Sequence, residues 1–153
     1  MTRSEDPGSG RVAIADEQAI EVDLGALERA AAWALDAAGI PHGHALSIAL
    51  VDRARIAELK ARFYGEHRAT DVLSFPMDPL DAPGEAQLGD VVICVAVAAR
   101  QARALGVPLE RELEHLLVHG ILHLAGRDHA DPADEVAMAR EERRILGLMR
   151  AAS

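Results

Sequence analysis

The sequence has few cysteine and aromatic residues and no long apolar run, and each shortage excludes a class of protein. It contains one cysteine, Cys94, so neither an internal disulfide nor a cysteine-rich zinc finger can form. Aromatic residues make up only 3% of the chain, so a core must be built mainly from Leu, Ile, Val and Ala. No charge-free apolar run is long enough to span a bilayer, and the polar residues 1–10 show no secretory signal. We therefore expect a cytoplasmic protein with no membrane partner.

Positive charge is also in short supply. The formal net charge of −9 argues against a protein that coats nucleic acid nonspecifically, because neutralising phosphates requires surplus Lys and Arg. A local basic cleft is still compatible with this balance. The segment 53–68 contains five basic residues against two acidic ones: Arg53, Arg55, Lys60, Arg62 and Arg68 against Glu58 and Glu66. A solvated helix face would show the same pattern, so both interpretations stay open.

The 153 residues fit one domain, which we place at 11–150 after a disordered tail at 1–10. Hydrophobic periodicity and turn residues predict the elements within it. The predicted strands are 11–15, 45–51, 70–75 and 89–95, with a loop at 78–87. The predicted helices are 23–38, a short helix after Asp52, 96–105, 108–125 and 132–148. This order predicts an α/β (α+β) domain with a mixed sheet of about four strands, flanked by about five helices.

A cluster of histidines carries the most specific chemistry in the sequence. His119 and His123 are four residues apart in a predicted helix, so they can direct two imidazoles at one ion, about 2.0–2.1 Å from a zinc. Gly126 suits the left-handed position that ends a helix, and His129 can then return as a third ligand. Three protein ligands leave one position open for a water that loses its proton more easily, as in catalytic zinc sites. A single helical histidine is more often structural, and it is this combination that favours a metal.

Two neighbouring residues limit the interpretation. His115 lies one turn before His119, and at about 1.5 Å per residue it is roughly 12 Å from His123 along the axis. One ion can therefore bind either 119 and 123 or 115 and 119, and His129 reaches only the first pair. His115 is then a cleft wall or a partner of a ligand.

Gly120 occupies the position where zincin proteases carry their glutamate base, which argues against a peptidase.

The segment 119–129, His-Gly-Ile-Leu-His-Leu-Ala-Gly-Arg-Asp-His, resembles the signature of the YbeY family of bacterial rRNA maturation factors. Two further blocks match that family in order and spacing, 70–76 (Thr-Asp-Val-Leu-Ser-Phe-Pro) and 88–94 (Leu-Gly-Asp-Val-Val-Ile-Cys). The resemblance implies a fold with the metal in a cleft. It also implies a metal-dependent, single-strand-specific endoribonuclease acting in 16S rRNA 3′-end maturation and ribosome quality control.

The resemblance assigns the zinc ligands to His119, His123 and His129, one Zn²⁺ per chain. Other transition metals also suit three imidazoles. Asp128 is a candidate for orienting a ligand rather than for the general base. Many family members carry a cleft arginine where this chain has Tyr64. Arg62 and Arg68 flank it and are our candidates for RNA binding.

The implied partners are single-stranded RNA, rRNA, and the ribosome or ribosomal proteins, without a nucleotide cofactor. An alternative function is a ribosome-assembly factor that binds RNA or ribosomal proteins around a mainly structural metal. A hydrolase of small molecules or peptides is a third class, which Gly120 and the resemblance both disfavour.

Overall fold

A computed structural model of the chain describes residues 9–126 and 132–152, which form four strands and five α-helices in the predicted order. The short 3-10 helix η1 (Ser9–Arg11) precedes them. The strands are β1 (Val12–Asp16), β2 (His44–Val51), β3 (Val72–Pro76) and β4 (Ala86–Cys94). The α-helices are α1 (Leu24–Ala37), α2 (Arg53–Tyr64), α3 (Val95–Leu105), α4 (Leu109–Leu124) and α5 (Pro132–Ala152).

The strands form one mixed sheet in the order β1-β2-β4-β3, which confirms the predicted fold class. β1, β2 and β4 are parallel, and β3 pairs antiparallel with β4, with Phe75 opposite Asp90. β3 is therefore an edge strand, which is the position where Pro76 can end it without removing a ladder hydrogen bond from the centre of the sheet.

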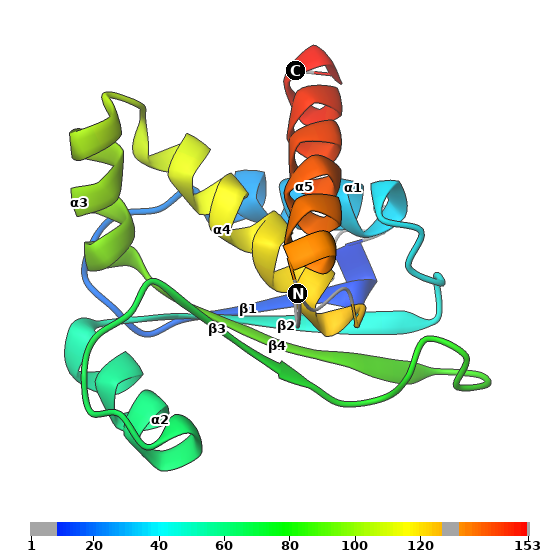
Figure 1. The fold of residues 1–153 in the computed structure, drawn as a ribbon, viewed down its shortest axis with the longest axis horizontal. Coiled ribbons are helices and arrows are strands. Elements are labelled where there is room, and N and C mark those ends of the chain that lie inside the picture. The colour runs from blue at the N-terminus through cyan, green and yellow to red at the C-terminus, as the bar shows by residue number, and fades with distance from the viewer. Residues whose placement is uncertain (1–8, 127–131, 153) are drawn as a thin grey trace, which may run out of the picture.

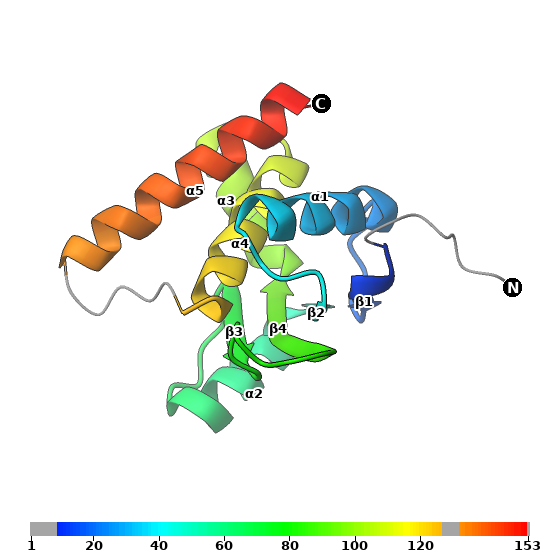
Figure 2. The same cartoon turned by 90° about the vertical axis from the view of Figure 1, so that its right-hand side faces the viewer.

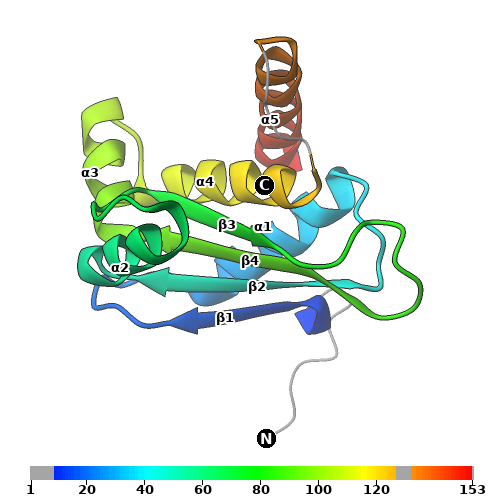
Figure 3. The ribbon, with the colours of Figure 1, turned by 60° about the horizontal axis from the view of Figure 1, so that its bottom comes forward.

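The helices cover the two faces of the sheet unequally. In Figure 1, α1, α3, α4 and α5 lie above the sheet, whereas α2 lies below it. Figure 3 shows α2 in front of the strands and α4 alongside the edge strand β3. In the view turned by 90°, α5 runs diagonally past the other helices, and its C-terminal end projects above them (Figure 2). None of the helices in the described ranges is long and apolar enough to cross a membrane.

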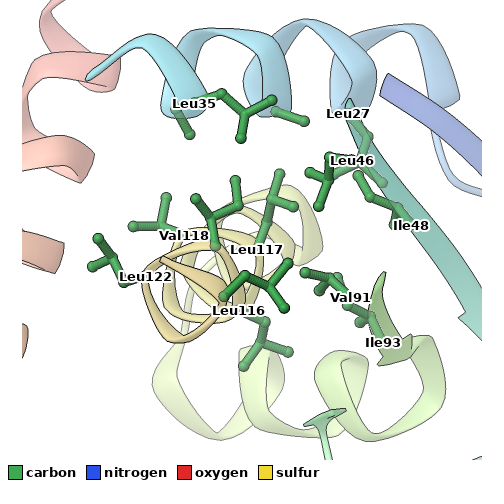
Figure 4. Close-up of a cluster of buried hydrophobic side chains, with 14 of the residues drawn as sticks. Leu27, Leu35, Leu46, Ile48, Val91, Ile93, Leu116, Leu117, Val118 and Leu122 are labelled. Atoms are coloured by element: carbon green, nitrogen blue, oxygen red, sulfur yellow. The ribbon is translucent and has the colours of Figure 1, made fainter. Parts of the chain in front are cut away.

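The main core lies between the sheet, α1 and α4. Figure 4 shows Leu35 of α1 and Leu46 of β2 on either side of Leu117, a fully buried residue of α4. Alternate residues of β2 point into this core, as a half-covered strand requires. A smaller cluster packs against α2 on the opposite face, formed by Val51, Ile56, Leu73, Val92, Cys94 and Val97. Cys94 is completely buried in this cluster.

Aspartate side chains cap the starts of α1 and α2, and a glycine ends α4. The Oδ1 atom of Asp23 accepts a hydrogen bond from the backbone N–H of Ala26 at 3.0 Å. Asp52 does the same for Arg55 at 2.9 Å at the start of α2. Gly126 has a φ of +81°, so it takes the left-handed conformation that ends α4. These contacts fix where α2 begins and where α4 ends, and the two helices carry the candidate site.

Several boundaries differ from the prediction, the largest at the C-terminal end, where α5 continues to Ala152 instead of residue 148. β3 begins at Val72 rather than at residue 70, because its partner β4 ends at Cys94, where α3 begins, and residue 70 therefore has no strand residue opposite it. β4 begins at Ala86 because this residue pairs with His44 in the neighbouring strand. Pro108 lies at the cap position before α4 instead of in its first turn.

Candidate metal centre and cleft

Two histidines of α4 meet at their ring edges. The Nε2 atoms of His119 and His123 are 3.0 Å apart, and the ring centroids are 4.5 Å apart. The helix brings them together because residues four apart lie on nearly the same face. Two nitrogen lone pairs repel each other at this separation unless a proton or a cation lies between them. This separation therefore accommodates either a hydrogen bond from one ring N–H to the other nitrogen or a cation bound by both.

A carboxylate from α5 sets the orientation of the first histidine. Glu142 Oε2 contacts the Nδ1 atom of His119, and Glu142 Oε1 lies 3.4 Å from Nε2 of His115. The other ring nitrogen of His115, Nδ1, is 3.7 Å from Oε1 of Glu112, a buried residue. Two carboxylates and two histidines thus alternate along the contact between α4 and α5.

This arrangement shifts the pKa values of its members. Burial by itself would raise the pKa of Glu142, but hydrogen bonds with His115 and His119 outweigh it and lower the pKa to about 2. The hydrogen bond with Glu142 raises the pKa of His115, against the opposing effect of burial. Glu142 is therefore an anion at neutral pH, and an anion next to Nδ1 of His119 keeps the proton on that nitrogen.

The donor set fits a transition-metal ion. With its Nδ1 proton directed at Glu142, His119 presents the lone pair of Nε2 toward His123. Two nitrogen ligands at about 2.0–2.1 Å from a tetrahedral zinc would be roughly 3.3 Å apart. The observed separation of 3.0 Å is close to that value. Imidazole nitrogens are also the usual ligands of zinc and neighbouring metals.

The other predicted residues of the centre, His129 and Asp128, lie outside the described residues. Within 9–126 and 132–152, no three His, Cys, Asp or Glu side chains form a cluster that could hold a metal. The structure thus brings together His119 and His123, and it places His115 behind them, against the carboxylate of Glu142.

The histidine pair opens into a cleft of about 490 Å³ between α4, β3 and α2. Its lining residues are Lys60, Tyr64, Asp71, Val72, Leu73, Ser74, Pro76, His119 and His123. Ser74 connects the three elements, since its hydroxyl donates to the carbonyl of Gly120 at 3.3 Å and its own carbonyl accepts from the Tyr64 hydroxyl at 3.3 Å. β3 therefore forms the wall of the cleft between α4, which carries the two histidines, and α2, which carries Lys60 and Tyr64.

Gly120 is a position where α4 packs closely against the sheet. A Cβ atom at this position would lie 2.8 Å from Cγ1 and 3.0 Å from Cγ2 of Val91, and 3.3 Å from Oγ of Ser74. The residue after His119 therefore faces the sheet, where a glutamate has no room. The absence of a protease-type base at Gly120 is thus imposed by packing as well as by sequence.

The two predicted RNA-binding arginines lie apart from this cleft's lining. Arg62 lines a different groove, of about 650 Å³, on the face of the sheet that carries α2. Its guanidinium lies 5.6 Å from the centre of the Phe63 ring. Arg68 is exposed, and its Nε atom is 3.5 Å from the carboxylate of Glu66. The lysine that does line the cleft, Lys60, and the carboxylate partner Glu142 are residues that the sequence did not single out.

Neither residue carried a signal in the sequence that could have identified it. Glu142 lies 23 positions after His119, on a helix with many acidic and basic residues. Lys60 is one of five basic residues in 53–68, and only its position relative to β3 distinguishes it from the others. Both depend on how separate elements pack together.

Comparison with known proteins identifies close similarity over nearly the whole chain. A family model described as Endoribonuclease YbeY matches residues 13–150. A protein named Endoribonuclease YbeY from Thermobifida fusca is 43% identical over 87% of this chain and 90% of its own length. Another of that name from Salinispora tropica is 42% identical over 91% of this chain and 96% of its own length.

A solved structure agrees with the fold. The solution structure of a protein from Thermotoga maritima matches with a TM-score of 0.59 and 25% identity, covering 92% of this chain and 93% of that one. The residues 13–150 that match the family model include the histidine helix, the described cleft lining and all of the sheet except Val12.

Proposed function

The chain belongs to the YbeY endoribonuclease family, and on this premise we propose that it is a metal-dependent endoribonuclease of single-stranded RNA. We further propose that its substrate is ribosomal RNA, cleaved during maturation of the 16S 3′ end, with a part in ribosome quality control. Its relatives are nucleases by name, so a hydrolase of phosphodiester bonds is the matching enzyme class.

The single observation that carries the proposal is the position of the histidine pair. His119 and His123 present two ring nitrogens 3.0 Å apart on the wall of a cleft of about 490 Å³. This volume lies within the range of about 300–1,000 Å³ typical of small-ligand sites, so the cleft suits nucleotides of an extended strand more than a duplex. A metal-dependent nuclease needs this combination of a cation site and an open approach for a phosphate.

We propose Zn²⁺ as the metal, one per chain, held by His119, His123 and His129. When bound, such an ion supplies Lewis acidity toward a phosphate oxygen and makes a water more acidic. The protein's own residues prepare the site for it. Glu142 fixes the tautomer of His119, and the hydrogen bond from Ser74 to the Gly120 carbonyl holds α4 against β3.

A general base is not evident among the described carboxylates of the cleft. Asp71 is the one carboxylate in the described lining, and both of its oxygens have partners. Oδ1 accepts from the Val72 N–H at 2.7 Å, and Oδ2 from the side-chain amide of Gln101 at 3.3 Å. Asp71 therefore anchors β3 to α3. The proton acceptor would then be bulk water, the substrate's own phosphate or a residue beyond the described part of the chain, and a bound metal would make the attacking group more acidic.

The test compares matched histidine variants. Wild type, a His119→Ala, His123→Ala double variant and a His67→Ala control are purified side by side, because contaminating nucleases are a danger in such assays. His67 is exposed and lies outside the described cleft lining, so its loss should leave cleavage unchanged. Metal content by mass spectrometry and cleavage of a single-stranded RNA are measured on all three.

We expect the double variant to lose both its metal and its RNA cleavage. Cleavage at the wild-type rate by the double variant would contradict the proposal. A wild type that binds metal and RNA without cutting would instead favour an assembly factor with a structural metal. The chemistry of the product end, a 2′,3′-cyclic phosphate or none, separates attack by the RNA's own 2′-hydroxyl from attack by water.

A further inference from the structure

Positive charge in the cleft comes from an unexpected position. Among the described residues that line the cleft, Lys60 is the one lysine or arginine. The predicted candidates Arg62 and Arg68 lie outside that lining, against Phe63 and Glu66 respectively. A phosphate that enters the cleft beside His119 and His123 therefore meets the ammonium of Lys60 before any described guanidinium.

The side chain of Lys60 is held in place along the cleft wall. It is 17% exposed, so its aliphatic stem is packed and its conformational freedom is already reduced. Its Nζ atom lies 5.3 Å from the centre of the Tyr64 ring, at a distance where the ring's π electrons attract a cation. Lys60 and Tyr64 are four residues apart on α2, so one helical face directs both at the cleft.

The same face of α2 is tied to the histidine helix through β3. The Tyr64 hydroxyl donates to the Ser74 carbonyl, and the Ser74 hydroxyl donates to the carbonyl of Gly120, next to His119. Lys60 thus belongs to a wall whose position relative to the histidine pair is set by hydrogen bonds. A residue on a freely moving loop would not have a fixed place in this way.

The ammonium remains available for a ligand. Its ionic contact is with Glu66 at 3.7 Å, and the Glu66 side chain is 57% exposed. Surface pairs of this kind contribute about 0–1 kcal/mol and are screened by salt, so a phosphate can replace the carboxylate. The one acidic residue of the described lining, Asp71, already has its oxygens engaged by Val72 and Gln101.

We infer that Lys60 binds a backbone phosphate of the RNA strand next to the phosphate that is cut. The inference rests on the proposed function, and it names the residue of this protein that positions the RNA strand. A lysine ammonium is a compact point charge with rotatable donors, which suits a phosphate whose exact orientation varies with sequence. Because the contact is with a flanking phosphate, its loss should raise KM more than it lowers kcat.

The test measures binding separately from cleavage. The full-length protein is titrated with a single-stranded 2′-O-methyl RNA at several salt concentrations, and the oligonucleotide is checked for integrity afterwards. Wild type is compared with Lys60→Met, which keeps the aliphatic stem, and Lys60→Arg, which keeps the charge. Arg103→Met is the matched control, because it removes one exposed positive charge from α3, outside the described lining.

We expect Lys60→Met to weaken binding roughly tenfold at low salt, as the loss of one charge-assisted contact would. The slope of log affinity against log salt should become shallower by about 0.7, the value for one phosphate contact in a single strand. Lys60→Arg should retain most of the affinity, and Arg103→Met should stay within about twofold of wild type, because the removed charge lies outside the cleft.

The possible failures are distinguishable. If wild type binds and cuts RNA but Lys60→Met keeps the wild-type slope and affinity, the inference about Lys60 is wrong while the proposed function stands. If wild type neither binds the oligonucleotide nor cuts RNA, both are wrong. Thermal melting of each variant checks that the substituted chains are folded.

Discussion

The Nδ1 atom of His119 on α4 contacts the Oε2 atom of Glu142 on α5, a residue 23 positions later in the chain. This contact fixes which nitrogen of His119 carries the proton, and it leaves Nε2 directed at His123. The carboxylate also lies 3.4 Å from His115, so it joins two successive turns of the histidine helix. α5 therefore takes part in building the candidate metal centre.

Glu142 should strengthen metal binding. Replacing it with Ala removes the hydrogen-bond acceptor that orients His119, and loss of such a partner typically lowers metal affinity about 10- to 100-fold. Competition with a chromophoric chelator measures the zinc affinity directly. Glu141→Ala is the control, since Glu141 pairs with Arg144 at 3.0 Å on the same helix. Equal affinities for the two variants would contradict the role of Glu142.

Acid should destabilise the metal-free protein partly through Glu142. Its pKa falls from 4.5 to about 2 because hydrogen bonds with His115 and His119 outweigh the opposing effect of burial. A carboxyl group with a lowered folded-state pKa contributes stability above its unfolded pKa, and this contribution is lost as pH falls through the folded value. Between pH 4.5 and about 2, the free energy of unfolding should thus fall more steeply in wild type than in Glu142→Gln. Denaturant titrations at pH values across this range give the slope of the free energy of unfolding against pH for each protein. Equal slopes in wild type and Glu142→Gln would argue against the ion pair.

Gly120 should be intolerant of any side chain. A Cβ atom there would approach Val91 Cγ1 to 2.8 Å, so Gly120→Ala forces α4 away from the sheet. We expect a loss of about 1–3 kcal/mol in the free energy of unfolding, typical of overpacking. Gly147→Ala on α5 is the matched control. Its Cβ would meet nothing within 4 Å, so it should gain up to about 1 kcal/mol from helix propensity. Urea denaturation of both variants is the measurement, and an equally stable Gly120→Ala would refute the close crossing.

The cap of α2 should matter for RNA binding as well as for stability. Asp52→Ala removes the acceptor for the Arg55 N–H, and Asp23→Ala removes the equivalent acceptor on α1. Each should cost about 1 kcal/mol of stability. Since α2 carries Lys60 and Tyr64 into the cleft, only Asp52→Ala should also weaken RNA binding. Titration of both variants with the same oligonucleotide tests this, and an equal loss of affinity in both would count against it.

Much of the fold could be predicted because its signals are local. Asp23 and Asp52 cap the helices that follow them, and Gly126 ends α4, each through contacts within a few residues. The boundaries that differed depend on partners distant in the chain, such as the pairing of Ala86 with His44, which extends β4. Local propensity cannot report such pairings.

The candidate site, too, has some relations that follow from the sequence and others that follow only from the tertiary structure. The sequence by itself determined that His119 and His123 lie side by side, since a spacing of four on a helix fixes their relation through backbone geometry alone. Only the tertiary structure decided that Glu142 stands behind His119, that Gly120 presses on Val91, and that Lys60 shares their cleft. These three relations join elements that are far apart in sequence. They exist because apolar faces pack α4 and α2 on opposite sides of one sheet, and no pattern within either helix encodes which residue the other will meet.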